Sequence, residues 1–285
     1  MTAQNAVKIV ECPRDAMQGW HKLITTEEKI TYINLLLKVG FDVIDFGSFV
    51  SPKAIPQMAD TRQVIPHLES SASRLLAIVA NERGAAEALE FDQISELGFP
   101  FSVSEEFQLR NTNSSREDSL KRVDAIAKFC SSANRKLVVY MSMAFGNPYG
   151  DEYSSDIVST WVDRIVDLGV DIVSLADTTG MSVASQIQPL STLLTTKYPS
   201  VEFGLHLHTR MDNWGSKLEA ALAGGITRVD GALKGIGGCP MAQDELVGNL
   251  DTSLIIDYLK SRGMMKPLDD SALAAALHKA EAIFT

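Results

Sequence analysis

Two histidines in one short apolar run, His206 and His208 in GLHLH, are the residues whose type and spacing best suit chemistry. In a β-strand, positions i and i+2 point to the same face, so both imidazoles can bind one divalent metal ion. The same pattern also occurs in packed cores that bind nothing. The place of this strand in the fold therefore decides between a metal site and a core.

The chain around the histidines divides into eight short apolar runs separated by stretches of helical character. The runs are VKIVEC from Val7, DVIDFGSF from Asp42, RLLAIVA from Arg74, FPFSVS from Phe99, KLVVYMSM from Lys136, DIVSLAD from Asp171, VEFGLHLH from Val201 and RVDGAL from Arg228. Eight strand–helix alternations in about 250 residues predict a closed (β/α)8 TIM barrel of the α/β class. An open doubly wound sheet is the alternative, but the chain has no Gly-rich dinucleotide fingerprint.

The first predicted helix shows how these units are delimited. Thr25 and Glu28 can form a capping box at its start, and Gly40 can end it. A glycine followed by an apolar residue and a new strand recurs along the chain, at Gly40-Phe41, Gly98-Phe99, Gly169-Val170 and Gly225-Ile226. This recurrence indicates a repeated unit. We therefore expect a single catalytic domain over residues 1–285, with a C-terminal helical extension over about 251–285.

Composition argues against several classes of partner. The 26 basic and 36 acidic residues give a net charge of −10, and no Lys/Arg-rich run could follow a phosphate backbone, so we expect no nucleic-acid partner. No apolar stretch is long enough to span a bilayer, and the first residues lack the pattern of a signal peptide. Three widely spaced cysteines, Cys12, Cys130 and Cys239, suit a reducing compartment. We expect a cytoplasmic protein with no membrane partner.

In a barrel of this kind the functional residues lie at the carboxyl ends of the strands, and the two histidines end the seventh. Because strand one closes on strand eight, Asp15, just past strand one, lies only two strands from His206. Asn249, after strand eight, can reach the same point. Such carboxylate, amide and imidazole ligands suit Mg²⁺ or Mn²⁺. The alternative for Asp15 is a turn or cap role in PRDA.

Further polar residues near predicted strand ends are candidates for substrate contacts. These are Asp45 and Ser48 at the end of strand two, Asn81 at the end of strand three, Tyr140 on strand five and Asp177 at the end of strand six. Each has an ordinary structural role as its alternative, such as a helix start at Asp177.

Five motifs, in order along the chain, carry a resemblance to a known family. They are VKIVECPRDAMQ, FGSFVSPKAIPQM, SLADTTG, GLHLH, and GIGGCPMAQ followed by GN. In these motifs the chain resembles the 3-hydroxy-3-methylglutaryl-CoA (HMG-CoA) lyases, within the metal-dependent TIM-barrel group that includes isopropylmalate and homocitrate synthases. The motifs extend from Val7 to Asn249 and cover nearly the whole chain.

The resemblance implies a role for each matching residue. The implied ligands of the divalent cation are Asp15, His206, His208 and Asn249. Arg14 is implied to contact the thioester oxygen of the substrate, and Cys239 to be the catalytic cysteine. Gln18 belongs to the implied substrate site. An acyl-CoA substrate follows from the same resemblance, and we also expect a homodimer or higher homo-oligomer.

The chemistry of such a lyase can be matched to these residues. Reverse Claisen cleavage of a β-hydroxy acyl thioester removes a proton from the tertiary hydroxyl, stabilises an enolate and delivers a proton to its carbon. Asp15 or His206 can accept the first proton, Arg14 can donate a hydrogen bond to the developing oxyanion, and the Cys239 thiol can supply the last proton. The alternative for Arg14 is a surface ion pair, and for Cys239 an incidental loop thiol.

Several positions depart from the lyase pattern. Thr209-Arg210 follows the histidine pair where the lyases usually have Asp-Thr, and Asp45 stands where they carry Glu. The loop between Gln243 and Gly248 has four residues instead of three. These changes lie near the proposed site and indicate a divergent branch, so a related acyl-CoA or hydroxy acid is an alternative substrate.

Two other functions stay open beside the lyase. One is a Claisen-type acyltransferase that condenses acetyl-CoA with a 2-oxo acid, and the other is a catalytically silent barrel. Cys239 favours the lyase over the acyltransferase because cleavage needs an acid. The intact set of candidate residues argues against the silent barrel. How CoA is held is open as well, since no diphosphate motif is present and Lys53 and Arg110 are only candidate loop cations.

Overall fold

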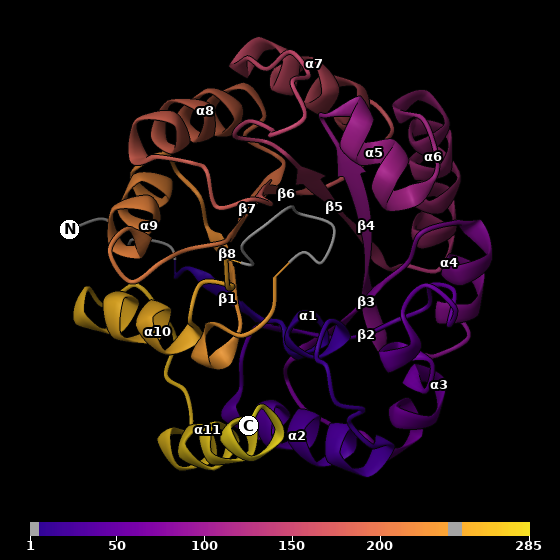
Figure 1. Cartoon of the computed structure of the whole chain (residues 1–285), viewed down its shortest axis with the longest axis vertical. Coiled ribbons are helices and arrows are strands. Elements are labelled where there is room, and N and C mark those ends of the chain that lie inside the picture. Colours follow the sequence, from indigo (N-terminus) through magenta and orange to yellow (C-terminus); the bar gives the residue numbers. More distant parts are fainter. Residues whose placement is uncertain (1–5, 239–246) are drawn as a thin grey trace.

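The structure is a computed structural model and describes residues 6–238 and 247–285. Eight parallel strands form a closed barrel in which each strand pairs with the next along the chain and β8 pairs with β1 (Figure 1). The strands are β1 (Lys8–Glu11), β2 (Val43–Ser48), β3 (Arg74–Ile78), β4 (Ile94–Ser102), β5 (Lys136–Ser142), β6 (Ile172–Asp177), β7 (Glu202–Leu207) and β8 (Arg228–Gly231). The predicted TIM barrel is confirmed.

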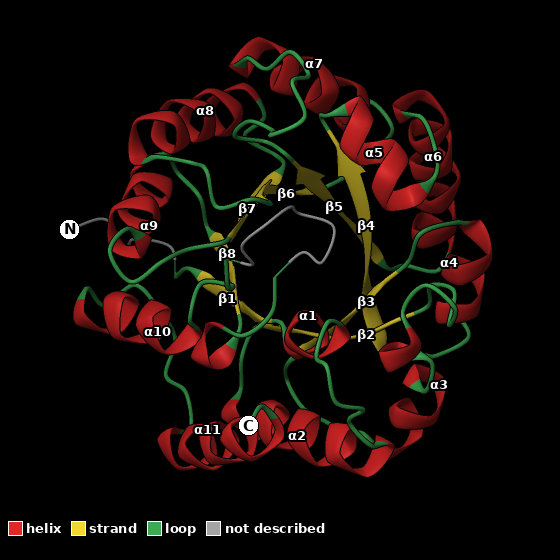
Figure 2. Cartoon of the chain, viewed as in Figure 1, coloured by secondary structure: helices red, strands yellow, loops and turns green. Residues whose placement is uncertain are grey.

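Helices form an outer ring around the strands, except for the short α1, which lies inside the ring directly after β1 (Figure 2). They are α1 (Pro13–Gln18), α2 (Thr26–Val39), α3 (Thr61–Val64), α4 (Glu82–Ala88), α5 (Glu105–Thr112), α6 (Arg116–Ser132), α7 (Ser155–Val166), α8 (Ala184–Lys197), α9 (Trp214–Ala223), α10 (Thr252–Ser261) and α11 (Asp270–Ile283). Short 3₁₀ turns occur at η1 (Pro56–Met58), η2 (Ile65–His67) and η3 (Leu233–Gly235). The last helix, α11, packs against α2, as Figure 1 shows. The division into a catalytic domain and a C-terminal extension stays a prediction.

Local signals in the sequence explain where α2 begins and ends. The Thr25 side chain accepts a hydrogen bond from the Glu28 backbone N–H, and the Glu28 carboxylate accepts one from the Thr25 N–H, so the predicted capping box is present. At the other end Gly40 adopts a φ of 85°, a left-handed conformation that glycine reaches without strain. Gly169 and Gly225 have similar values, 82° and 87°.

The glycine junction predicted at Gly98-Phe99 is wrong. β4 already begins at Ile94, so Gly98 lies inside the strand rather than before it. A Cβ at Gly98 would lie 2.5 Å from Ile78 Cδ1, which shows that its small size serves close packing inside the barrel. The strand start was missed because Glu96, a residue that usually marks an exposed position, is fully buried there.

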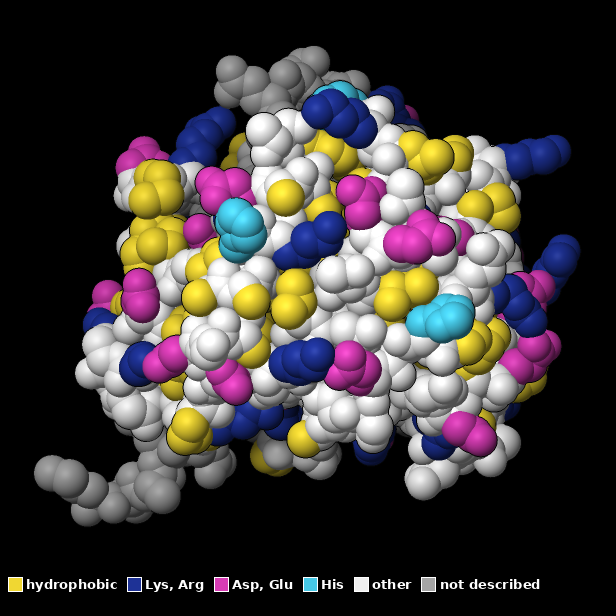
Figure 3. Space-filling model, turned by 90° about the horizontal axis from the view of Figure 1, so that it is seen from below, with side chains coloured by type: hydrophobic (Ala, Val, Ile, Leu, Met, Phe, Trp, Pro, Cys, Tyr) yellow, Lys and Arg dark blue, Asp and Glu magenta, His cyan; other side chains and the backbone are white. Residues whose placement is uncertain are grey.

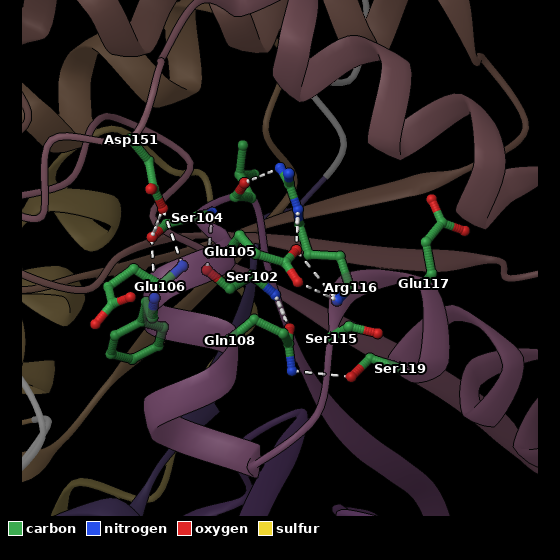
Figure 4. A network of polar contacts seen from close by, with 12 residues as sticks. Ser102, Ser104, Glu105, Glu106, Gln108, Ser115, Arg116, Glu117, Ser119 and Asp151 are labelled. Atoms are coloured by element: carbon green, nitrogen blue, oxygen red, sulfur yellow. Dashed lines mark hydrogen bonds and ion pairs between the residues drawn. The ribbon is translucent and has the colours of Figure 1, made fainter.

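Polar contacts fix the carboxyl end of β4 to the helices that follow it (Figure 4). Gln108 of α5 accepts a hydrogen bond from the Ser102 backbone N–H at 2.7 Å and donates one to the Ser119 hydroxyl of α6 at 3.0 Å. Ser104 caps the N-terminus of α5 and donates to the Asp151 carboxylate. These hydrogen bonds position the carboxyl end of β4 at the mouth of the barrel through polar contacts.

Acidic and basic side chains are interspersed on the face of the molecule drawn in Figure 3. Within residues 6–238 and 247–285, no helix is long and apolar enough to cross a membrane.

Candidate active site

Asp15 and Asn249 meet at the carboxyl end of β1. Pro13 starts α1 directly after the strand, and Asp15 lies in the first turn of this short helix. Asn249 Nδ2 donates a hydrogen bond to Asp15 Oδ2 at 2.7 Å and another to the Ile236 carbonyl at 2.8 Å. Its Oδ1 is buried and has no hydrogen-bond partner among the residues that the structure describes. The two hydrogen bonds of Nδ2 thus fix the orientation of the Asn249 amide, and Oδ1 stays available as an acceptor.

The two histidines are adjacent, and His208 forms a backbone bridge with Asn249. His208 Nδ1 donates to the Val247 carbonyl at 2.9 Å, and His206 Nδ1 lies 3.3 Å from Asp230 Oδ2. The two ring centroids are 5.2 Å apart. Because a carbonyl and a carboxylate accept hydrogen bonds, each Nδ1 carries a proton, and in the neutral imidazole Nε2 keeps its lone pair. This tautomer leaves Nε2 free to bind a metal ion.

The ionisation of these groups is strongly coupled. Burial raises the pKa of Asp15, but Arg14 and both histidines outweigh it and leave the pKa at about 2. Burial lowers the pKa of His206, yet the hydrogen bond and charge of Asp230 raise it above its ordinary value. The pKa of His208 is lowered by burial and by the neighbouring His206. At neutral pH the Asp15 carboxylate is therefore ionised.

These residues fit a hard divalent cation. The sequence-predicted ligands lie after β1, at the end of β7 and after β8: Asn249 donates to Asp15 and forms a backbone bridge with His208, and the His206 and His208 rings are adjacent. The ligand atoms of Asp15, His206 and His208 do not all lie within 4.8 Å of one another. They offer a carboxylate, two imidazole nitrogens and the unpartnered Asn249 Oδ1, a donor set typical of Mg²⁺ or Mn²⁺. The buried Asn249 Oδ1 is compatible with such a ligand role, because a buried amide acceptor left without a donor is costly unless something else binds it.

Arg14 is held beside Asp15 by three charged contacts. Its Nε and Nη2 donate to the Asp45 carboxylate, and its Nη1 donates to Asp15 Oδ1 at 2.8 Å. The two carboxylates outweigh the effect of burial, which by itself lowers the pKa of Arg14, so this pKa is raised and the guanidinium stays charged. Gln18 Nε2 donates to the same Asp15 oxygen at 3.0 Å. Arg14 is thus a fixed cation at the mouth of the barrel and not a surface ion pair.

The other candidates for substrate contacts are placed as follows. Ser48 is buried at the end of β2, where its hydroxyl accepts a hydrogen bond from the Val50 N–H. Tyr140 packs edge-on against His206, and its buried hydroxyl has no hydrogen-bond partner. Asp177 ends β6 and accepts hydrogen bonds from the Ser182 hydroxyl and from a lysine of α9. Asp45 holds Arg14.

The predicted position of Asn81 is wrong. β3 ends at Ile78, and Asn81 instead caps α4, with its Oδ1 accepting a hydrogen bond from the Gly84 N–H at 2.9 Å. Cys12 was placed within strand one and lies just after it, at the N-cap of α1. Both differences arise because β1 ends one residue, and β3 two residues, before the end of its apolar run.

Sequence reasoning missed two polar residues that support the histidines. Asp230, on β8, is the register neighbour of His206 and contacts its Nδ1. Lys217, on α9, donates to Asp177 Oδ2, to the Gly180 carbonyl and to the His208 carbonyl, at 2.8, 2.9 and 3.2 Å. A charged residue inside the apolar run RVDGAL was the available signal for Asp230, and no comparable signal marks Lys217.

The structure does not place three further predicted residues at the site. Cys239 lies outside the described residues. Lys53 is exposed, and Arg110 is exposed and pairs with Glu106 on its own helix while its guanidinium lies 4.7 Å from the centre of the Tyr149 ring.

Comparisons with known proteins agree with this geometry. A family model described as HMGL-like matches residues 6–279. The mitochondrial hydroxymethylglutaryl-CoA lyase of Homo sapiens is 32% identical over 267 residues, which cover 92% of this chain and 81% of that protein. A hydroxymethylglutaryl-CoA lyase of Bacillus subtilis is 32% identical over 249 residues, with 87% and 83% covered.

Solved structures of HMG-CoA lyases are similar to this chain as well. The HMG-CoA lyase structure from Bacillus subtilis matches with a TM-score of 0.90 and 30% identity, covering 99% of this chain and 94% of that one. An HMG-CoA lyase from Acinetobacter baumannii, in complex with coenzyme A and 3-methylmalate, matches with a TM-score of 0.90 and 28% identity, covering 100% and 93%. The carboxyl transferase domain of Rhizobium etli pyruvate carboxylase, at 14% identity and a TM-score of 0.66, shares the fold.

Proposed function

Since the chain belongs to the HMGL-like family, as its motifs predicted, we propose that it is a carbon–carbon lyase. The proposed reaction cleaves HMG-CoA, or a close 3-hydroxyacyl-CoA, to acetyl-CoA and acetoacetate or its homologue. The observation that carries this proposal is the convergence of Asp15, His206, His208 and Asn249 at the barrel mouth beside the fixed charge of Arg14. The coenzyme A bound in the Acinetobacter relative supports an acyl-CoA substrate.

A divalent cation, Mg²⁺ or Mn²⁺, is the proposed cofactor. Its ligands would be Asp15, His206 and His208 through their free lone pairs and Asn249 through Oδ1. When bound there, the cation lowers the pKa of the substrate's tertiary hydroxyl and clamps a substrate carboxylate.

Arg14 stabilises the oxyanion that develops on the thioester. Its Nε–H and one proton of each terminal nitrogen are used by Asp45 and Asp15. One proton on Nη1 and one on Nη2 therefore remain for the substrate oxygen. Because both carboxylates fix the guanidinium before substrate arrives, little reorganisation is needed as charge develops on the oxygen.

Proton transfer belongs to the same group of residues. With a cation bound, Asp15 accepts the hydroxyl proton, because His206 carries a proton on Nδ1 and gives its one lone pair, on Nε2, to the cation. His206 is the acceptor only where Nε2 is not bound to the cation, and Asp230 then favours its positive charge. The Cys239 thiol, which lies outside the described residues, stays the predicted acid for the acetyl enolate. We expect Cys239→Ala to lower kcat by roughly 100-fold or more while substrate affinity changes little.

A product assay tests the proposed reaction. Purified protein with Mg²⁺ or Mn²⁺ is incubated with a panel of 3-hydroxyacyl-CoA thioesters, and the products are identified by mass spectrometry. Acetyl-CoA together with a 3-oxo acid supports the lyase and identifies the acyl group that the Thr209-Arg210 and Asp45 departures admit. If no thioester is cleaved while acetyl-CoA and a 2-oxo acid condense, the protein is an acyltransferase instead.

A further inference from the structure

A second group of metal-ligand atoms lies on the Nδ1 side of the His206 ring. Cys12, His206 and Asp230 each offer one ligand atom, and these atoms all lie within 4.8 Å of one another. The three residues come from neighbouring walls of the barrel, because β8 pairs with both β7 and β1. Within residues 6–238 and 247–285, no other group of three or more His, Cys, Asp or Glu residues has this spacing.

The group is deeply buried and its polar atoms are incompletely satisfied. Cys12 and Asp230 are each only 1% exposed. Within the described part of the chain, Asp230 Oδ1 has no hydrogen-bond partner, and the Cys12 thiol makes one weak contact, to the Val10 carbonyl at 3.7 Å. A buried carboxylate oxygen without a donor leaves room for a ligand that carries positive charge.

We propose that Cys12, His206 Nδ1 and Asp230 form an inner binding site for a soft divalent cation such as Zn²⁺ or Cd²⁺. Thiolate, imidazole and carboxylate are the three protein ligands of open zinc sites, in which a fourth position stays free. Tetrahedral bonds of about 2.0–2.3 Å place neighbouring ligand atoms roughly 3.3–3.8 Å apart. His206 Nδ1 and Asp230 Oδ2, at 3.3 Å, already have this spacing.

The charges around Cys12 favour a cation. The carboxylates of Asp230, Asp45 and Asp15 act on Cys12 against the single opposing charge of Arg14. The metal-free residue is a thiol, the ordinary form of cysteine at neutral pH. When the cation binds, the S–H bond breaks, a sulfur–metal bond forms, and the proton leaves to solvent, so one charge of the cation is neutralised in place.

The inner site and the proposed outer cation site compete for the same imidazole. A neutral imidazole has one lone pair in the ring plane and carries its proton on the other nitrogen. A cation on His206 Nδ1 shifts that proton to Nε2, which can then no longer bind the outer cation. Soft cations therefore inhibit, and Mg²⁺ or Mn²⁺ antagonises the inhibition. This consequence rests on the proposed function, whereas the inner site itself does not.

Cadmium titration of the metal-free protein tests the inner site directly. A cadmium–thiolate bond absorbs in the ultraviolet, so binding at Cys12 gives a saturable signal at a single equivalent. The signal should remain in Cys239→Ala and Cys130→Ala and disappear in both Cys12→Ser and Cys12→Ala. Asp230→Asn should weaken cadmium binding by about 10-fold or more. A signal that survives in the Cys12 variants, or that Cys239→Ala removes, overturns the proposal.

A second measurement separates the inner site from the proposed reaction. Inhibition of Mn²⁺-supported turnover by Zn²⁺ should weaken about 10-fold or more in Cys12→Ser, whatever the activity of that variant alone. Inhibition that is equally strong in Cys12→Ser contradicts the competition. If the wild-type protein cleaves no thioester, the proposed function fails, while the cadmium signal still decides the inner site.

Discussion

Asn249 illustrates how one side chain can organise a site and still offer a ligand atom. Its amide nitrogen is held by Asp15 and by the Ile236 carbonyl, so the direction of Oδ1 is set before any cation arrives. The two residues are 234 positions apart in the chain, and only closure of the barrel brings them together. Such preorganisation removes the entropic cost of ordering the amide upon binding.

At Arg14 we predict a change in turnover rather than in affinity. Arg14→Met should lower kcat by about 100-fold or more and change KM much less, because the oxyanion exists mainly along the reaction path. Arg14→Lys keeps the positive charge but loses the planar guanidinium that donates to Asp45 and Asp15, so it should restore only part of kcat. Steady-state kinetics on the best thioester measures both. A variant in which only KM changed would make Arg14 a simple binding residue.

Glu11 links stability to pH. Burial raises its pKa from 4.5 to about 8, although its carboxylate accepts hydrogen bonds from Thr252 and from the Leu233 N–H. The folded protein therefore holds this proton more tightly than the unfolded chain does. Its contribution to stability is complete below about pH 4.5 and is lost as the pH rises through about 8. Each pH unit within that window costs up to about 1.4 kcal/mol.

The matched variant is Glu11→Gln, which cannot ionise; its Oε1 can still accept from the Leu233 N–H, and its amide NH2 can donate to the Thr252 hydroxyl. We expect its free energy of unfolding to fall less between pH 6 and pH 8.5 than that of the wild-type protein, measured by denaturant titration. Parallel pH curves for the two proteins would show that Glu11 does not titrate in this range.

The central residues of the site could be predicted from sequence because each follows a strand. His206, His208, Asp15 and Asn249 all follow from the rule that strand ends meet at one face of the barrel. Asp230 and Lys217 could not be identified this way. Their roles depend on the register between β7 and β8 and on the side of α9 that faces the loop after β6, neither of which the local sequence specifies.

At the scale of single elements, the capping box of α2 predicts a measurable stability difference. Thr25→Ala removes the side chain that accepts from the Glu28 N–H and should lower the free energy of unfolding by about 1 kcal/mol. Thr31→Ala, in the middle of the same helix and exposed, is the control. It should be neutral or slightly stabilising because alanine is the better helix former. Equal effects of the two substitutions in thermal or denaturant unfolding would show that the cap contributes nothing.

Strand positions were predicted within a few residues except at β4. Seven apolar runs overlap the observed strands almost fully, since their β-branched residues pack on both faces of the barrel wall. In β4 the first half, Ile94–Leu97, contains the buried Glu96, and its charge conceals the strand from any pattern based on hydrophobicity. Its partner is on the opposite wall of the barrel, which no local signal can reveal.

At the scale of the whole molecule, that partner is Arg228 of β8, which crosses the barrel interior. Its Nη2 donates to Glu96 Oε2 at 2.8 Å, and both side chains are fully buried. The other Glu96 oxygen lies 2.9 Å from Arg74 Nη1. The pair ties opposite sides of the barrel beneath the proposed site.

Removing one member of this pair should be strongly destabilising. Arg228→Met leaves the Glu96 charge buried with only Arg74 beside it, so we expect a loss of about 3–5 kcal/mol in the free energy of unfolding. The double variant Arg228→Met with Glu96→Gln removes that charge and should recover part of the loss. Chemical denaturation of four proteins measures this: the wild type, Arg228→Met, Glu96→Gln and the double variant. A double variant as unstable as the sum of the two single variants would contradict a direct interaction.

The most direct test of the account is the dependence of cleavage on a divalent cation held by the four converging residues. Protein treated with a chelator and shown by metal analysis to be metal-free is titrated with Mn²⁺, and acetoacetate release from HMG-CoA is measured alongside Mn²⁺ binding. The account predicts no cleavage without metal, activity that rises with occupancy of one site, and weaker Mn²⁺ binding in His208→Ala and Asn249→Ala. Full cleavage by the metal-free protein, or unchanged Mn²⁺ binding in both variants, would contradict it.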